Sequence, residues 1–111
     1  MSRLASMLGH MTSYAVVWKS GSQSPMSGRL ELDPHGLWLD GGNRDQHVRI
    51  EIPYDEIVSV ERGASLRLGP CRAIRLHTRA AGSLLLATIA GIATQSEIIA
   101  QLQDALATIS F

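Results

Sequence analysis

Short runs in which hydrophobic residues occupy every second position make up most of the chain. This alternation is typical of strands that bury one face and expose the other. In residues 27–32, for example, two leucines face one side while Arg29 and Glu31 face the other. The pattern predicts seven antiparallel strands, at residues 14–18, 27–32, 37–40, 47–52, 57–61, 72–78 and 83–90.

Turn residues separate these runs. Asp33-Pro34-His35-Gly36 is a strong turn signal, because proline presets φ at the second position and glycine tolerates the closing conformation. Residues 62–70 are expected as a glycine-rich loop. Connections of this kind leave no room for the helical crossovers of a parallel sheet. We therefore expect a mainly β fold, an antiparallel sandwich or partly open barrel.

One helix is predicted, at the end of the chain. Residues 94–109 carry an apolar stripe at helical spacing, and Thr94 and Glu97 match the T-x-x-E capping box of a helix start. Such a stripe must dock on the sheet, because an isolated helix of this length is marginal in water. Residues 83–90 are apolar on both faces and should be covered on both, with the helix as the cover for one of them.

Composition restricts the classes of function. The 111 residues form one domain by size, and 45% of them are hydrophobic, which fits a folded globular protein. Ten basic and ten acidic residues give zero net charge, so the basic excess of a nucleic-acid-binding protein is missing. No apolar run approaches the ~18–20 residues that cross a bilayer. The single cysteine, Cys71, cannot form an internal disulfide, and a reducing cytoplasm is the expected location.

The first eleven residues stand apart from the expected domain at 12–111. Leu4, Met7, Leu8 and Met11 fall at helical spacing. Three interpretations stay open: a short helix that covers one end of the barrel, a mobile tail left by cloning, or a membrane-surface anchor. The last three residues of the segment, Gly-His-Met, resemble a cloning scar, and a single positive charge gives an anchor little support.

Charge is unevenly distributed along the chain. Residues 31–61 hold eight acids and two bases, a net of −6, whereas residues 62–96 hold five arginines and no acid, a net of +5. One interpretation is ordinary cross-strand pairing, with opposite charges meeting where the strands at 57–61 and 72–78 adjoin. The other is a polarised interaction surface, for a partner or for self-association into a homo-oligomer.

Four segments resemble the pleckstrin-homology (PH) superfold. They are GRLELDPHGLWLDGG at 28–42, IPYDEIVSVERG at 52–63, AIRLHTRAAGSLLLATI at 73–89 and TQSEIIAQLQDAL at 94–106. In the second segment a strand ends at a proline and restarts in an apolar stretch, as in PH-like domains. The chain looks like the bacterial PH-like and GRAM-like members of the superfold, over residues 12–109. The resemblance implies a seven-stranded antiparallel sandwich or partly open barrel, capped by a C-terminal helix.

The resemblance also implies a binding function, because PH-like domains mostly bind phosphoinositide head groups, peptides or other proteins. The lipid-binding subset carries a basic pattern across its first two strands. Here Lys19 and Arg29 match that pattern, but Glu31 stands at the next basic position. A phosphorylated head group needs several converging donors. We therefore expect protein–protein interaction first, association with anionic lipid as an alternative, and a small apolar ligand inside the barrel as a third interpretation.

Arginines and one tryptophan are the candidate contact residues. The basic half of the chain contributes Arg67, Arg72, Arg75 and Arg79, on the strand at 72–78 and its flanking loops. Trp38 lies between two leucines that face the core, so alternation places it on the outer face, where a tryptophan can anchor a partner. Cover by the N-terminal residues is the structural alternative for Trp38.

Catalytic chemistry is not expected. Serines lie in loops without the G-x-S-x-G context of a nucleophile elbow. The adjacent acids Asp55 and Glu56 suit a turn, and the glycines of 63–69 lack the Lys-Ser/Thr ending of a phosphate-binding loop. The four histidines lack the spacing of a metal site, although His47 and His77 could align if their strands were neighbours. We therefore expect a non-catalytic module without metal or cofactor.

Overall fold

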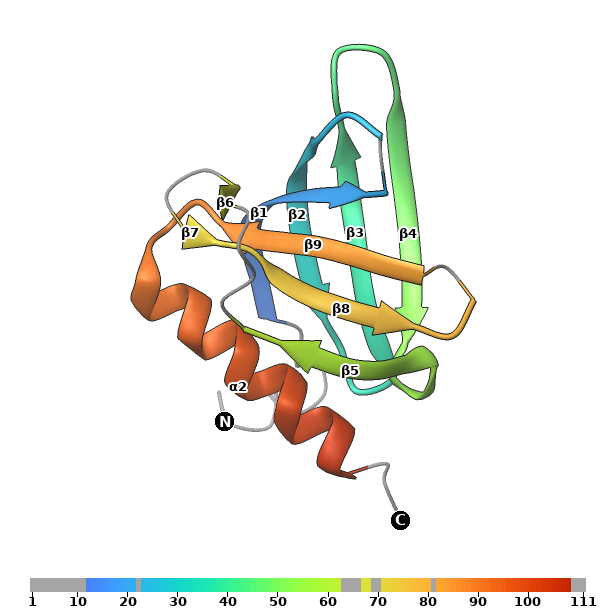
Figure 1. Cartoon of the computed structure of the whole chain (residues 1–111), viewed down its shortest axis with the longest axis vertical. Helices are drawn as coiled ribbons and strands as arrows, with labels where there is room; N and C mark the ends of the chain where they lie inside the picture. Colours follow the sequence, from blue (N-terminus) through green and yellow to red (C-terminus); the bar gives the residue numbers. More distant parts are fainter. Residues whose placement is uncertain (1–11, 22, 63–66, 69–70, 81, 109–111) are drawn as a thin grey trace, which may run out of the picture.

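A seven-stranded antiparallel sheet forms the body of the protein (Figure 1). The computed structural model describes residues 12–21, 23–62, 67–68, 71–80 and 82–108. The strands of the sheet are β1 (Thr12–Ser20), β2 (Met26–Leu32), β3 (Gly36–Gly42), β4 (His47–Pro53), β5 (Ile57–Glu61), β8 (Ile74–Thr78) and β9 (Gly82–Thr88). Their order is β4-β3-β2-β1-β9-β8-β5, and the sheet curls around a core (Figure 1). The predicted fold class is confirmed.

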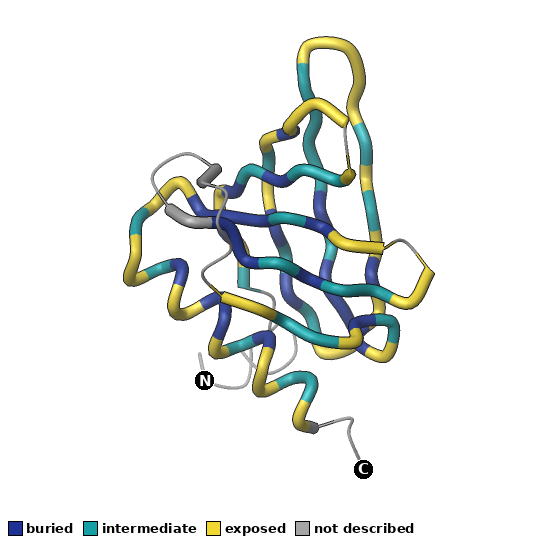
Figure 2. The backbone as a smooth tube through the Cα atoms, in the orientation of Figure 1, coloured by how far each residue is buried: buried dark blue, intermediate teal, exposed yellow. Residues whose placement is uncertain are grey.

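Alternation along the strands separates an inner apolar face from an outer polar face. In β3, Leu37 and Leu39 are fully buried, whereas Trp38 between them is half-buried on the outer side. Inner side chains from all seven strands meet in one core cluster, so burial of apolar surface acts across the whole sheet. Figure 2 shows the resulting distribution, with buried positions along the strands and exposed positions at the turns.

A two-stranded hairpin lies within the segment that was expected as a glycine-rich loop. β6 (Arg67–Leu68) and β7 (Cys71–Arg72) pair with each other and lie against β9. The prediction of a loop at 62–70 is therefore wrong for residues 67–68. Strands of two residues are too short to show an alternating pattern, which explains why the sequence does not indicate them.

The outer face of β9 carries a second, smaller apolar cluster. Ala73 and Ala87 are fully buried there, with Val17 and Leu85 packed against them. The expectation that residues 83–90 are covered on both faces is met for Ala87 on this side, where the hairpin lies against β9, but it is wrong for Ile89, which is 56% exposed. The helix covers the inner side.

Helix α2 (Ile92–Thr108) closes one end of the curled sheet (Figure 1). Its Ile98, Ile99 and Leu102 are buried in the same core cluster as the inner faces of the strands. The helix lies against β5, β9 and the 3-10 turn η1 (Tyr54–Glu56). The predicted docking of the terminal helix is confirmed. Among the described residues, no helix combines the length and the apolar character that crossing a bilayer requires.

The predicted capping box at the start of the helix is wrong. The helix begins at Ile92, so Thr94 already lies inside its first turn. Gly91, with a φ of 114°, turns the chain out of β9, and its carbonyl oxygen accepts a hydrogen bond from the Gln95 N–H at 3.0 Å. Glycine adopts a positive φ without the strain that a Cβ would cause. The Glu97 carboxylate is consequently available for a contact with the sheet.

Tyr14 of β1 joins the sheet to the helix through two hydrogen bonds. Its hydroxyl donates to Glu97 Oε2 at 2.5 Å and accepts from Gln101 Nε2 at 2.7 Å. Burial, and then the hydrogen bond to Glu97, raise the pKa of the Tyr14 phenol well above its usual range. The folded state therefore favours the neutral phenol strongly.

Gly28 of β2 and Gly41 of β3 face each other as cross-strand partners. A Cβ on Gly28 would lie 2.2 Å from the backbone carbonyl oxygen of Asp40, and one on Gly41 would lie 2.2 Å from that of Ser27. A side chain at either position would have to displace the backbone of the neighbouring strand. The glycine pair therefore permits a close backbone approach that other residues exclude.

We expect Gly28→Ala to lower the free energy of unfolding by about 1–3 kcal/mol, because its Cβ forces the β3 backbone to shift. Ser27→Ala, at the exposed position just before it, is the matched control and should change that free energy by less than about 0.5 kcal/mol. Urea unfolding followed by tryptophan fluorescence measures both variants. Equal stability of the two would contradict the close approach of the strands.

We expect Tyr14→Phe to lower the free energy of unfolding by about 1 kcal/mol at pH 8, through loss of both hydrogen bonds. The folded-state pKa of Tyr14 is raised above the unfolded value of about 10, so this stabilisation is complete below pH ~10 and is lost as the pH rises further. Urea unfolding at pH 8 and pH 10.5 should show the difference between wild type and variant shrinking. A difference that does not change with pH would rule out this linkage.

Candidate functional site

The outer face of β2, β3 and β4 gathers charged and aromatic side chains around Trp38. The strand register places Glu31 of β2 and Glu51 of β4 directly opposite Trp38. We call this surface the Trp38 face, and define it by Arg29, Glu31, Trp38, Asp40, His47, Arg49 and Glu51. Aromatic and arginine side chains are the types that most often dominate binding energy at protein interfaces.

Two contacts fix the position of the Trp38 ring. Its Nε1–H donates a hydrogen bond to Asp33 Oδ2 at 2.8 Å, and the guanidinium carbon of Arg49 lies 4.5 Å from the ring centroid. The second contact is a cation–π interaction. The ring is half-buried, so part of it still meets solvent. The structure thus matches the predicted outward orientation of Trp38, whereas cover by residues 1–11 lies outside the described residues.

Asp33 organises the turn that leads into β3. One carboxylate oxygen accepts hydrogen bonds from the backbone N–H of His35 at 2.8 Å and of Gly36 at 2.9 Å, while the other accepts from Trp38. Its carbonyl oxygen accepts from the Tyr54 hydroxyl at 2.7 Å. Burial disfavours the charged carboxylate, but the hydrogen bonds outweigh burial and lower the pKa of Asp33. The turn residue therefore also helps to set the position of the Trp38 ring.

Several charged side chains of the Trp38 face pair with one another. Arg29 Nε lies 3.0 Å from Glu31 Oε2. Asp40 contacts two partners, His47 Nε2 at 2.9 Å and Arg49 Nη1 at 3.6 Å. Pairs this exposed add little to stability, but they hold both signs of charge at defined positions around the indole ring.

The four arginines proposed as contact residues lie on the β6–β7 hairpin, on β8 and just after β8. Arg67 and Arg72 face each other across the β6–β7 hairpin, and their side chains lie outside the described residues. Arg75 of β8 stands opposite Glu61 of β5, which matches the cross-strand pairing expected between the acidic and basic halves. β2, β1 and β9 separate β8 from β3, so Arg75 and Trp38 lie on distant strands of the sheet.

Arg79, the last of these arginines, is engaged with the chain itself. Its backbone N–H donates to the carbonyl oxygen of Glu56 at 2.9 Å, and its Nε donates to that of Asp55 at 3.0 Å. The two acids thereby hold the turn η1 against the end of β8 through their backbone carbonyls. The turn expected at Asp55 and Glu56 is present as η1, but these bonds use the backbone of the two acids and not their carboxylates.

Lys19 and Arg29, the lipid-binding alternative, stand well apart on the outer face. Lys19 lies on β1, and Arg29 on β2 is the cross-strand partner of Ala15. Four residues along β1 separate Lys19 from Ala15, a distance of about 13 Å. Arg29 is also paired with Glu31. The two cations do not converge on a common point in the described structure.

Ser83, His77 and Glu61 form a row across β9, β8 and β5 that sequence reasoning missed. Ser83 Oγ lies 3.2 Å from His77 Nδ1, and His77 Nε2 lies 3.3 Å from Glu61 Oε1. The row depends on the register between three strands. The sequence around each residue indicates only an outward-facing polar side chain. The side chains of His77 and Glu61 are 36% and 57% exposed, so the row shares residue types with a serine triad but not its water-excluding environment.

The histidines of the described residues, His35, His47 and His77, do not converge on a metal site. His47 lies on β4 and His77 on β8, and these strands are not neighbours, so the two side chains do not align across the sheet. Within the described ranges, no group of three or more His, Cys, Asp and Glu side chains could hold a metal ion.

Comparison with solved structures identifies the fold. No protein-family model matches the sequence, and no curated protein matches it. The crystal structure of the C-terminal domain of an unknown protein from Leishmania infantum is similar with a TM-score of 0.67 and 21% identity, over 96% of this chain and 94% of that one. The solution structure of the N-terminal PH domain of human ARAP2 is similar with a TM-score of 0.65 and 13% identity, over 93% and 84%. The chain therefore has a PH-like fold.

We expect Asp33→Asn to lower the free energy of unfolding by about 1–2 kcal/mol at pH 7, because the charged acceptor of three hydrogen bonds is lost. The folded-state pKa of Asp33 is lowered, so its contribution is present above the unfolded value of about 3.9 and is lost as the pH falls through the folded value. Urea unfolding at pH 7 and pH 3 should show the effect shrinking in acid. Asp45→Asn, an exposed acid in the next turn, is the control and should have little effect at either pH.

Proposed function

We propose that this chain is a non-catalytic PH-like binding module that contacts a partner protein through the Trp38 face. The observation that carries the proposal is the fixed position of the Trp38 ring between Asp33 and Arg49. A side chain held in place before binding loses little conformational entropy when a partner arrives. The ring offers apolar area, and the surrounding pairs offer both donors and acceptors.

A protein surface suits the Trp38 face better than a lipid head group does. The charges around Trp38 are mixed, with Arg29 and Arg49 beside Glu31 and Asp40. An anionic membrane would be repelled by the acids as much as it is attracted by the bases. Mixed charge at defined positions instead gives register and specificity to a protein–protein contact.

Association with anionic lipid stays the alternative, through Lys19, Arg29 and the arginines of the basic half. The third interpretation, an apolar ligand enclosed by the barrel, loses support because inner residues such as Leu30, Leu39 and Leu76 are fully buried against one another. A cytoplasmic location, membership of the bacterial GRAM-like group and self-association remain predictions.

Affinity capture from the native cell, with quantitative mass spectrometry, tests the protein-binding proposal. Trp38→Ala removes the anchor, and we expect its specific partner to be captured about 30-fold less, the loss typical of an interface hot spot. Gln103→Ala, at an exposed position of α2, is the control and should capture the partner like wild type. Arg49→Glu is a second variant that disturbs the face without removing a half-buried ring.

Three results would count against the Trp38 face. The first is equal capture by wild type, Trp38→Ala and Arg49→Glu. The second is a stability loss of roughly 3–5 kcal/mol in Trp38→Ala, which would mark the ring as core. The third is sedimentation with phosphatidylserine vesicles at low salt that Trp38→Ala leaves unchanged, together with no protein captured, which would favour the lipid alternative.

A further inference from the structure

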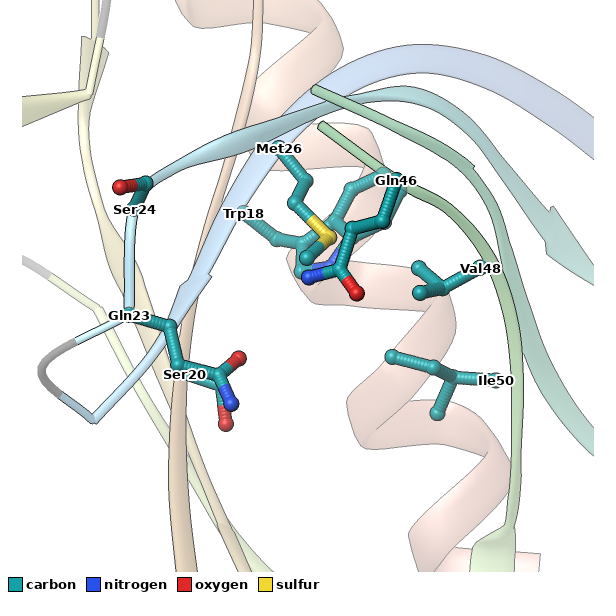
Figure 3. Close-up of a pocket in the computed structure, with 8 residues that line it drawn as sticks. All are labelled: Trp18, Ser20, Gln23, Ser24, Met26, Gln46, Val48 and Ile50. Carbon is teal, nitrogen blue, oxygen red and sulfur yellow. The ribbon is translucent and has the colours of Figure 1, made fainter. Parts of the chain in front are cut away.

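A pocket of about 180 Å³ lies at the end of the curled sheet away from α2, between the β1–β2 connection and β4 (Figure 3). We call it the mouth pocket. Its apolar walls are Trp18, Met26, Val48 and Ile50, and its polar rim is Ser20, Gln23, Ser24 and Gln46. It opens on the inner side of the sheet, whereas the Trp38 face lies on the outer side. The two surfaces are therefore separate.

The walls of the mouth pocket are built into the core. Trp18 is 1% exposed and Met26 is 5% exposed, and both belong to the main core cluster, against which Val48 and Ile50 also pack. Cross-strand pairing of Trp18 with Met26 fixes the two walls relative to each other. The pocket is therefore formed in advance rather than created by a ligand.

The lining of the mouth pocket carries no ionisable side chain. A phosphate or carboxylate entering it would lose hydration without gaining an ion-pair partner, which is costly. The volume is close to that of an engineered cavity of ~150 Å³ that admits benzene. The uncharged lining and the volume of the pocket together suit one uncharged group as large as a branched aliphatic or aromatic side chain.

The rim of the mouth pocket is held in place by its own backbone. The Gln23 N–H donates to the carbonyl oxygen of Ser20 at 3.1 Å. Asn43 closes the β3–β4 turn, since its Oδ1 accepts from the Gln46 N–H at 3.1 Å and its own N–H donates to the Gln46 carbonyl oxygen at 3.0 Å. These bonds use only the backbone groups of the two glutamines, so within the described part of the chain they leave the side-chain amides to face the pocket.

The glutamine amides match the chemistry of a peptide. Gln23 and Gln46 are exposed, and both line the mouth pocket, Gln23 from the β1–β2 connection and Gln46 from the β3–β4 turn (Figure 3). Each amide offers a donor and an acceptor, which is the same pair of functions that a peptide group presents. A polypeptide that inserts one apolar side chain would place its own backbone at this rim.

From these observations we infer that the mouth pocket binds one large uncharged side chain of a partner polypeptide, with Gln23 and Gln46 hydrogen-bonding the backbone beside it. Trp18 and Met26 are walls that this side chain contacts. The inference goes beyond the Trp38 face and does not depend on it, because no residue is shared between the two surfaces.

The experiment titrates the full chain with blocked amino acids and follows the two tryptophan indole N–H signals by NMR. The probes are N-acetyl-leucinamide and N-acetyl-phenylalaninamide, and the charged counterparts are N-acetyl-aspartamide and inositol trisphosphate. We expect a saturable shift of the Trp18 signal with the apolar amides, with a dissociation constant on the order of 10 mM, because a single side chain supplies little binding energy. The charged compounds should leave the Trp18 signal unchanged.

Val48→Phe fills the pocket and should abolish the Trp18 shift. Val58→Phe, the same substitution at a position of β5 that is 61% exposed, is the matched control and should keep it. Gln46→Phe is a second blocking variant at an exposed rim position, in case Val48→Phe does not fold. The double variant Gln23→Ala, Gln46→Ala should weaken binding of the blocked amino acids. It should not weaken binding of isopentanol, which has the apolar group without a peptide unit.

The inference fails if the apolar amides do not shift the Trp18 signal up to their solubility limit. It also fails if the shift persists in a folded blocking variant, or if inositol trisphosphate shifts Trp18 and the amides do not. If the glutamine substitutions change the affinity for the blocked amino acids and for isopentanol equally, the assignment of a polypeptide ligand is overturned. The Trp38 indole reports separately, so these outcomes are distinguishable from a failure of the Trp38 face.

Discussion

The sheet has to enclose its own apolar inner face, and most other features of the structure follow from this constraint. Inner residues of all seven strands meet in one cluster because the sheet curls around them. The curl is compatible with the close approach of β2 and β3 at Gly28 and Gly41, where a side chain would strike the neighbouring backbone. A sheet that curls without closing into a full barrel also leaves two ends. One end receives α2, and the other forms the mouth pocket.

Closure by the helix depends on polar contacts as well as apolar burial. Burial of Ile98 and Leu102 favours docking but does not define where along its axis the helix comes to rest, because the hydrophobic effect is not directional. Hydrogen bonds of Tyr14 and Gln95 are directional and define the position of the helix. Tyr14 bonds to the helix from β1, and Gln95 Oε1 accepts from the Thr88 N–H of β9 at 2.8 Å. These two contacts fix the helix against both neighbouring strands at the centre of the sheet.

The elements could be predicted from the sequence because their signals are local, and the contacts between them could not. Alternation in residues 27–32 indicates a strand without reference to any other segment. Glu97, by contrast, suited a local capping box, and its actual partner Tyr14 lies 83 residues away. The same limit applies to the site: the outward position of Trp38 follows from alternation, while its contact with Arg49 depends on the register of β3 and β4. The bond from Trp38 to Asp33 spans only five residues across a recognisable turn, so a closer reading of that turn could have found it.

The surfaces of the protein differ in how many of their polar and charged groups are already bonded to other groups of the chain. Arg79 is bound to backbone carbonyls, Arg75 stands opposite Glu61, and the Ser83–His77–Glu61 row is internally bonded and exposed. The Trp38 face and the mouth pocket combine fixed positions with surface that a partner can still contact. This surface is the exposed part of an indole ring in one case, and two exposed glutamine side chains over apolar walls in the other. Binding gains most where groups are held in place before the partner arrives and still lack their best contacts. Both surfaces therefore suit a polypeptide. Neither suits a phosphate, because the charges of the Trp38 face are mixed and the lining of the mouth pocket is uncharged.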